Sequence, residues 1–170
     1  NRNELAQVSS SLHRVQPLQF LRIGFDRYPW GARENKNCWE YFYEQVEIPH
    51  SVRTDYFYVK RDEDAESALL KEQNPDNKPY IFLHDDASRG YRIDMDKVTE
   101  GYHIIRNDNT KNIFHFIKVL ENADEIHCME SAFKSLIDIY AKTADLYFHD
   151  FRGHPLGKRT NRNWGIINYE

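Results

Sequence analysis

The sequence has little cysteine, no long hydrophobic run and no excess of basic residues. Its 170 residues include two cysteines, Cys38 and Cys128, too few for a disulfide framework or a cysteine-based metal set. No apolar run approaches the roughly 18 residues that a membrane-spanning helix needs. Lys and Arg number 23 against 27 Asp and Glu, which excludes the basic footprint of a nucleic-acid-binding protein. These absences predict a cytoplasmic protein with no nucleic-acid partner and no membrane span.

The composition is that of a folded globular domain. Hydrophobic residues make up 40% of the chain and charged residues 29%, which argues against disorder. The length suffices for one domain with a buried core. The chain begins at Asn1, with no initiator Met and no leader. We therefore expect either a piece of a longer protein or a chain numbered from a processed end.

Short β-prone runs alternate with amphipathic helical stretches. The predicted strands lie at 55–59, 79–83, 91–93, 102–106, 125–129 and 146–148, and the predicted helices at 37–47, 61–73, 112–122 and 132–143. This alternation predicts an α/β fold with a mainly parallel sheet and flanking helices. We expect an irregular N-terminal segment over residues 1–60 and an α/β domain over 61–170. The apolar patch at 164–167 is assigned no element.

The segment 124–153 is predicted to run strand, turn, helix, strand. The turn falls at Glu130 and Ser131, directly before the helix that carries Phe133 on its apolar face. A helix that starts at a strand end leaves free backbone N–H groups and the positive end of its dipole at the edge of the sheet. Phosphate groups bind at such places in α/β proteins. The alternative is that Ser131 serves only as a helix cap.

A second polar cluster follows the predicted strand 79–83. It consists of His84, Asp85, Asp86, Ser88, Arg89 and Gly90. Ligands of open α/β sheets bind at the carboxyl ends of strands, so these are candidate binding residues. Arg89 suits a phosphate, and Gly90 allows a ligand to approach the backbone. The alternative is a surface turn in which Asp86 and Ser88 make local bonds and Arg89 pairs with a carboxylate.

Several histidines and carboxylates also lie near predicted strand ends. His149 and Arg152 follow the strand 146–148, where His149 is a candidate acid–base or ligand donor, or else caps the strand end. His127 alternates with apolar neighbours and is interpreted as a core or interface histidine. A metal hypothesis would draw on His84, Asp85, Asp86, His127, His149, Asp150 and His154. These residues come from separate strands without compact ligand spacing, so no metal ligand is predicted.

Two motifs carry a resemblance to a known family. They are IFLHDDASRGY at 81–91 and IHCMESAFKSL at 126–136, the latter matching at Glu130, Ser131, Phe133 and Ser135. With them the chain resembles glycosyltransferases of the two-lobed B-type fold, in particular the donor-binding C-terminal half of fucosyltransferase-like enzymes. That family has a strand ending in a turn of the form HxRRGDY and a Ser-Ser-Phe-Ser helix start that meets the donor's diphosphate. The resemblance covers roughly residues 78–152.

The resemblance implies a Rossmann-like domain that binds a nucleotide-diphosphate sugar and transfers the sugar to a glycan or small-molecule acceptor. The candidate catalytic residues are His84, Asp85 and Asp86, with Asp85 or Asp86 as the base for the acceptor hydroxyl. The candidate donor-binding residues are Ser88, Arg89, Gly90, Glu130, Ser131, Phe133, His149 and Arg152. No metal or other cofactor is expected, because the helix dipole and cationic side chains stabilise the leaving diphosphate in this fold.

The chain departs from the family pattern at three points. Asp85 and Asp86 stand where the family has basic residues, Ala132 replaces one expected serine, and no Gly-rich acceptor-lobe loop is visible. A missing N-terminal segment would explain the last point, and so would a domain that binds without transferring. Two alternatives therefore stay open: a non-catalytic α/β module that binds a nucleotide or a protein, and a metal-dependent phosphate hydrolase.

Overall fold

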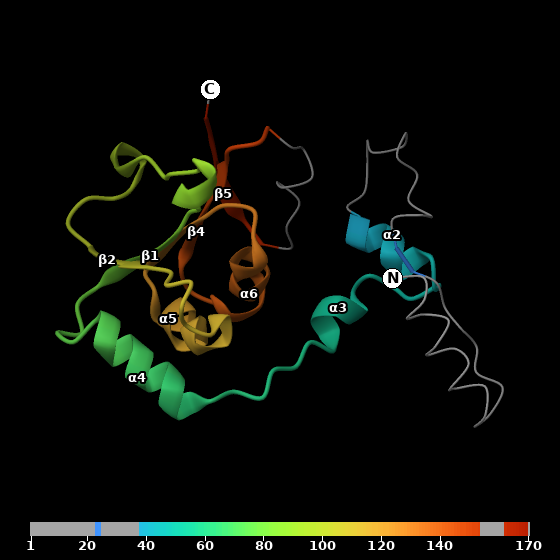
Figure 1. Cartoon of the computed structure of the whole chain (residues 1–170), viewed down its shortest axis with the longest axis horizontal. Helices are drawn as coiled ribbons and strands as arrows, with labels where there is room; N and C mark the ends of the chain where they lie inside the picture. Colours follow the sequence, from blue (N-terminus) through green and yellow to red (C-terminus); the bar gives the residue numbers. More distant parts are fainter. Residues whose placement is uncertain (1–22, 25–37, 154–161, 170) are drawn as a thin grey trace. The chain divides into compact units, whose positions relative to one another are not determined.

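The structure is a computed structural model that describes residues 23–24, 38–153 and 162–169 (Figure 1). The chain divides into two units, Asn1–Asp55 and Tyr56–Glu170. The described helices of the first unit are α2 (Cys38–Glu44) and α3 (Val52–Asp55). Within this unit the Gln45 amide bonds to both the N–H and the C=O of Gly24, at 3.0 and 3.1 Å.

The second unit alternates helices and strands. Its elements are α4 (Glu63–Gln73), β1 (Tyr80–His84), η2 (Ala87–Arg89), η3 (Met95–Lys97), β2 (His103–Arg106), η4 (Ile113–Phe116), α5 (Ile117–Asn122), β3 (Glu125–Cys128), α6 (Ala132–Tyr140), β4 (Asp145–Asp150) and β5 (Trp164–Asn168). The strands form one five-stranded sheet in the order β2-β1-β3-β4-β5, and every neighbouring pair is parallel. The predicted α/β fold with a parallel sheet and flanking helices is confirmed.

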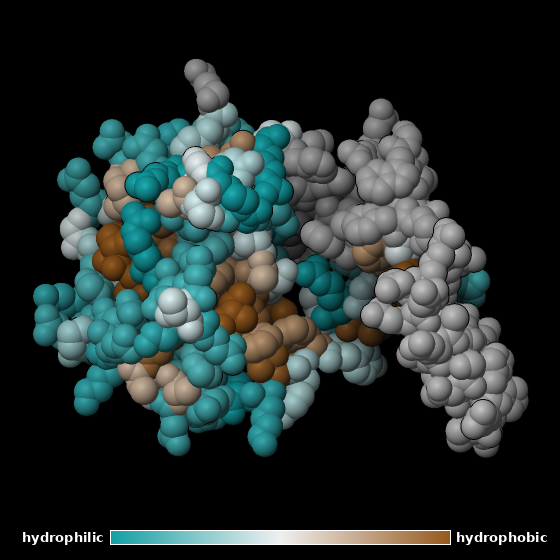
Figure 2. All heavy atoms as spheres, in the orientation of Figure 1, coloured by the Kyte–Doolittle hydropathy of each residue, from teal (hydrophilic) through white to brown (hydrophobic). Residues whose placement is uncertain are grey.

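The main core lies between the sheet and the helices α4, α5 and α6, which lie together on one of its faces (Figure 1). Three phenylalanine rings form its centre. Phe82 of β1 lies 5.9 Å from Phe116 and 5.4 Å from Phe133, and Phe116 lies 5.4 Å from Phe133. Figure 2 shows that the surface of this unit on the drawn side is mostly hydrophilic, as expected when the apolar side chains are used inside.

The other face of the sheet is covered differently. Ile81 and Leu83 of β1 pack there against Ile93 and Val98, which belong to the connection between β1 and β2. This connection contains the short 3-10 helices η2 and η3 but no α-helix. Parallel strands are usually joined by a helical crossover that covers the sheet, so this connection needs other means of attachment.

Two of the predicted strands are wrong. Residues 55–59 do not form a strand, since Asp55 ends α3 and the segment after it has no regular structure. Residues 91–93 contribute only an isolated antiparallel bridge between Asp86 and Tyr91. In both places β-propensity alone was insufficient, because a strand forms only where a neighbouring strand offers a free edge. At 164–167 the sequence analysis assigned no element, but in the structure this apolar patch is part of strand β5.

Candidate functional site

The strand order places the two sequence motifs side by side. From β1 the chain moves outward to β2, then returns to the other side of β1 to form β3. The connections that leave β1 and β3 therefore diverge, and ligands of doubly wound sheets bind at the carboxyl ends of the strands at such a switch point. The last residue of β1, His84, is the register partner of the last residue of β3, Cys128.

His84 is the most unusual polar residue at this edge. It is 8% exposed, and its ring lies 4.6 Å from the ring of Phe133 in the first turn of α6. Burial lowers the pKa of His84, although a hydrogen bond with Asn107 opposes the shift, so the neutral ring is favoured. Its Nδ1 atom is buried without a hydrogen-bond partner in the described part of the chain. A buried polar atom in that state costs about 1–3 kcal/mol, which a ligand would recover.

The N-terminus of α6 lies next to this ring. Ser131 occupies the N-cap position with extended backbone, but its side chain makes no capping hydrogen bond. The Ser131 hydroxyl instead lies 3.8 Å from the Sγ atom of Cys128, a thiol whose pKa burial raises. Ser131 is therefore the N-cap residue by position, as the cap alternative expects, but its side chain does not cap the helix. The helix keeps N–H groups and the positive end of its dipole that Ser131 does not neutralise.

The turn after β1 matches the surface-turn alternative. Asp86 accepts hydrogen bonds from the Ser88 hydroxyl and from Arg89 Nε, both at 2.5 Å. These bonds lower the pKa of Asp86 to about 2. Gly90 ends η2 with a φ of 80°, and no atom of the described residues beyond its chain neighbours lies within 4 Å of the position that a Cβ would take. Its role here is a left-handed turn conformation.

Asp85 is held by two donors. Its Oδ2 atom accepts from the backbone N–H of Ile93 at 3.0 Å and from Arg106 Nη1 at 3.2 Å. Both this carboxylate and that of Asp86 already accept hydrogen bonds, so neither is free to act as a general base in this structure. A carboxylate with a pKa of about 2 is also a weak base at neutral pH.

The remaining candidate residues have different surroundings. Phe133 is buried in the core, and Glu130 is half-buried in the turn before α6. Arg152 is exposed, with its guanidinium 5.4 Å from the ring of Tyr91. His149 lies on the opposite face of the sheet from His84, because neighbouring residues of a strand alternate between faces. The structure thus brings the end of β1 and the start of α6 together and places His149 elsewhere.

His149 belongs to a group that the sequence analysis missed. It shares the second face of the sheet with His127, Glu125 and Tyr169, and the four side chains are hydrogen-bonded in a row. His127 is buried with both ring nitrogens bonded, in agreement with its interpretation as a core histidine. The spacing of Glu125 and His127 was an available signal, since residues two apart in a strand share a face. Tyr169 had no such signal.

The buried histidines predict a pH-dependent stability. Burial is the main cause that lowers the pKa of His84, His127 and His149 from the ordinary value of 6.5, in the case of His149 to about 3. Between pH 6.5 and 3 the unfolded chain therefore binds more protons than the folded chain. The stabilising contribution is complete above pH 6.5 and is lost as the pH falls toward 3.

We expect the free energy of unfolding, measured by urea denaturation, to fall steadily as the pH is lowered from about 7 to about 5. His149→Gln, which cannot titrate, should show a flatter profile in the same range. This window lies above the range in which carboxylates with lowered pKa values take up protons. A stability that is constant over these two pH units would contradict the assignment of neutral buried rings.

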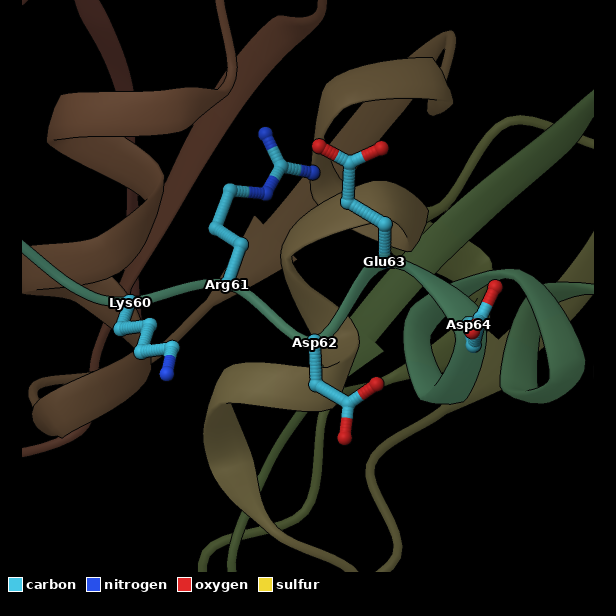
Figure 3. A pocket seen from close by; sticks show the side chains of 5 residues that line it. All are labelled: Lys60, Arg61, Asp62, Glu63 and Asp64. Carbon is cyan, nitrogen blue, oxygen red and sulfur yellow. The ribbon is translucent and has the colours of Figure 1, made fainter.

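Surface hollows occur away from this edge. One is lined by residues 60–64, at the start of α4, where Figure 3 shows the Arg61 and Glu63 side chains extending to the same side and Asp62 away from them. Arg61 is already bonded to Glu66 and Glu121. Another hollow lies at the amino ends of β1 and β2, beside Pro79. Neither offers the unsatisfied groups of the β1–β3 edge, so we place the candidate site at that edge.

Two further observations concern the described residues alone. They contain no group of three or more His, Cys, Asp or Glu side chains arranged to hold a metal ion. His154, which the metal hypothesis included, lies outside them. They also contain no helix of sufficient length and apolarity to cross a membrane.

Fold and site together define an α/β domain with a five-stranded parallel sheet and a candidate ligand edge at its β1–β3 switch point. Comparisons with protein-family models, with curated proteins and with solved structures found no match. The resemblance to B-type glycosyltransferases therefore stays a hypothesis, which rests on the two motifs and on the chemistry of the edge.

Proposed function

We propose that this chain binds a nucleotide-diphosphate sugar at the β1–β3 switch point, as the donor-binding part of a glycosyltransferase. The observation that carries the proposal is the unpartnered Nδ1 atom of His84 beside the start of α6. Burial lowers the pKa of His84 and so favours the neutral ring. Its Nδ1 atom has no hydrogen-bond partner among the described residues and is left for a ligand.

The edge thus offers two binding features to a ligand. Nδ1 of His84 needs a hydrogen-bond partner, such as a sugar hydroxyl, which can donate or accept. The N-terminus of α6 favours an anion, such as a diphosphate. A nucleotide-diphosphate sugar carries both groups a short distance apart. Arg89, with a side chain 59% exposed, supplies a cation that can leave its weak surface pair with Asp86 to meet the diphosphate.

The test is a thermal-shift screen against GDP, UDP, ADP, CMP and their sugars, with magnesium and with EDTA. We expect one nucleoside diphosphate and its sugar to raise the melting temperature independently of metal. At a ligand concentration 100 times the Kd, binding stabilises the chain by about 2.7 kcal/mol, which is well within detection. No shift with any of these ligands would overturn the proposal. A shift with magnesium alone would favour the phosphate hydrolase.

His84→Phe separates binding from stability. The variant keeps an aromatic ring against Phe133 but lacks the ring nitrogen that the ligand is proposed to satisfy. We expect the affinity for the nucleotide sugar, measured by calorimetry, to fall at least about tenfold, because one buried hydrogen bond is lost. Stability should stay equal or rise, since an unsatisfied buried nitrogen is removed. Full affinity in this variant would contradict the role of His84.

One observation favours a second candidate, a module that binds a nucleotide sugar without transferring the sugar. Asp85 and Asp86, the expected bases, are both engaged in hydrogen bonds within the chain. Donor hydrolysis and transfer to acceptor sugars, assayed at saturating donor, discriminate the two functions. Turnover that is lost in Asp85→Asn or Asp86→Asn supports transfer with a base from this turn. Tight binding without any turnover supports the binding module.

A further inference from the structure

Four polar side chains form an unbroken hydrogen-bonded row on the face of the sheet opposite the helices. Glu125 Oε1 lies 2.6 Å from His127 Nε2, and His127 Nδ1 lies 2.7 Å from His149 Nε2. His149 Nδ1 in turn lies 2.6 Å from the hydroxyl of Tyr169. Glu125, His127 and His149 are 8%, 1% and 1% exposed. Parallel strands usually carry apolar side chains at such positions, so the presence of a buried polar row here calls for a structural or functional explanation.

With both rings neutral and Glu125 accepting, one arrangement of protons satisfies every bond of the row. A carboxylate only accepts, so His127 donates to Glu125 from Nε2 and accepts at Nδ1. His149 then donates from Nε2 and accepts at Nδ1 from the Tyr169 hydroxyl. Both rings are neutral in this arrangement, which agrees with the lowered pKa values of the two histidines. The row is therefore directional, with Glu125 at the acceptor end and Tyr169 at the donor end.

Both ends of the row hold the connection between β1 and β2. At the acceptor end, the Thr99 hydroxyl donates to Glu125 Oε2 at 2.8 Å. At the donor end, the backbone N–H of Asp94 donates to the Tyr169 hydroxyl at 3.2 Å. The two attachment points flank η3. The row thus spans the sheet beneath η3 and is bonded to the chain on both sides of it.

The connection has few other attachments at this place. Residues 94–97 are exposed, and only the flanking Ile93 and Val98 are buried in the second hydrophobic cluster. Lys97 adds a bond from Nζ to the backbone C=O of Asn168 at 3.2 Å, next to Tyr169 in the chain. With no α-helix in the connection, its attachments at this place are two apolar residues, the bonds to the row and its neighbour, the bond from the Ile93 N–H to Asp85 and a contact of Arg106 Nη2 with Met95 Sδ at 3.4 Å.

The same connection begins at the candidate ligand edge. The N–H of Ile93 donates to Asp85 in the turn after β1, and the N–H of the next residue, Asp94, donates to Tyr169. Two successive backbone amides therefore join the ligand-edge turn to the row. A displacement of residues 93 and 94 would alter the position of Asp85, and with it the turn that carries Arg89.

We propose that Glu125, His127, His149 and Tyr169 are positioning residues, which clamp the β1–β2 connection to the sheet and thereby hold the turn at 85–90 in the geometry that binds the ligand. The ligand part rests on the proposed function, whereas the clamp is a property of the unliganded chain. The Tyr169 hydroxyl is its central atom, because this atom donates to His149 and accepts from Asp94.

Tyr169→Phe removes this hydroxyl and keeps the ring that stacks on Phe151 at 4.2 Å. Tyr147→Phe is the matched control, because Tyr147 stacks on His127 at 4.8 Å on the same face and its hydroxyl makes no hydrogen bond to the described residues. We expect amide hydrogen exchange over residues 94–99 of the unliganded full chain to become about tenfold faster in Tyr169→Phe alone. Imidazole nitrogen NMR should show His127 and His149 as neutral rings protonated at Nε2. The His149 Nδ1 resonance should shift in Tyr169→Phe.

The second readout is the Kd for the nucleotide sugar found in the screen, which should rise about fivefold in Tyr169→Phe and stay constant in Tyr147→Phe. Unchanged exchange in Tyr169→Phe, or equal acceleration in both variants, overturns the clamp. Faster exchange with an unchanged Kd overturns the positioning of the ligand turn. If the unaltered chain binds no nucleotide, the proposed function fails, and the exchange and NMR results still decide the clamp.

Discussion

Phe116→Ala is expected to lower the free energy of unfolding by about 3–5 kcal/mol. Phe116 is 0% exposed and contacts the rings of Phe82 and Phe133, so its removal leaves a cavity at the centre of the main core. Because Phe82 belongs to β1 and Phe133 to α6, the cavity loosens the packing of the helices on the sheet. Urea denaturation with an unchanged m-value would measure the effect.

Phe114→Ala is the matched control for this substitution. Phe114 lies two residues earlier in the same 3-10 helix but is 39% exposed. The same chemical change there should cost less than about 1 kcal/mol, because little apolar surface returns to water. Equal losses in the two variants would show that the change disturbs η4 itself and that no central cavity is formed.

Arg61→Ala should have the second largest effect, a loss of about 3 kcal/mol. The Arg61 guanidinium pairs with Glu66, which is 1% exposed, and with Glu121 at 2.7 Å, so it joins the start of α4 to α5. Truncation leaves the Glu66 carboxylate buried without its counter-charge, and that desolvated charge is the main cause of the loss. Thermal or urea unfolding measures this loss of stability, and the test does not depend on the proposed function.

Two comparisons identify the cause of that loss. Arg61→Ala combined with Glu66→Leu should regain most of the stability, since an apolar side chain replaces the stranded carboxylate. Lys111→Ala removes an exposed pair with Glu72 and should cost less than about 1 kcal/mol. If the double variant is as unstable as Arg61→Ala, the loss comes from the missing contact of the Arg61 guanidinium with the Tyr140 ring, which lies 5.8 Å away.

The fold could be predicted where the signals were local. The apolar runs that became β1 and β3 and the periodic stretches that became α4 and α6 were found within a few residues of their ends. The strand expected at 91–93 failed for a tertiary reason, because the N–H of Ile93 is bonded to Asp85 and is unavailable to a neighbouring strand. In β5 the apolar run is short and includes Gly165, and it pairs with β4 only across a long stretch of chain.

In the candidate site, too, local features could be predicted from the sequence and tertiary ones could not. That His84 and Ser131 lie at the carboxyl ends of strands was visible in the sequence, and the parallel order of the sheet places those two strands side by side. The side of the sheet that His149 occupies was not visible, because it depends on where β4 begins and on its register with β3. The partners of Asp85 and Asp86 were also hidden, although the surface-turn alternative anticipated the bonds among Asp86, Ser88 and Arg89.

The bond between Asp94 and Tyr169 joins residues 75 positions apart in the chain. Contacts of such long range form late, because the intervening chain must first be ordered. During synthesis, the connection between β1 and β2 therefore cannot form this bond until β5 and Tyr169 have been made. A nascent chain that ends before residue 169 would already hold most of its core and would still lack the attachment on which its ligand-edge turn depends.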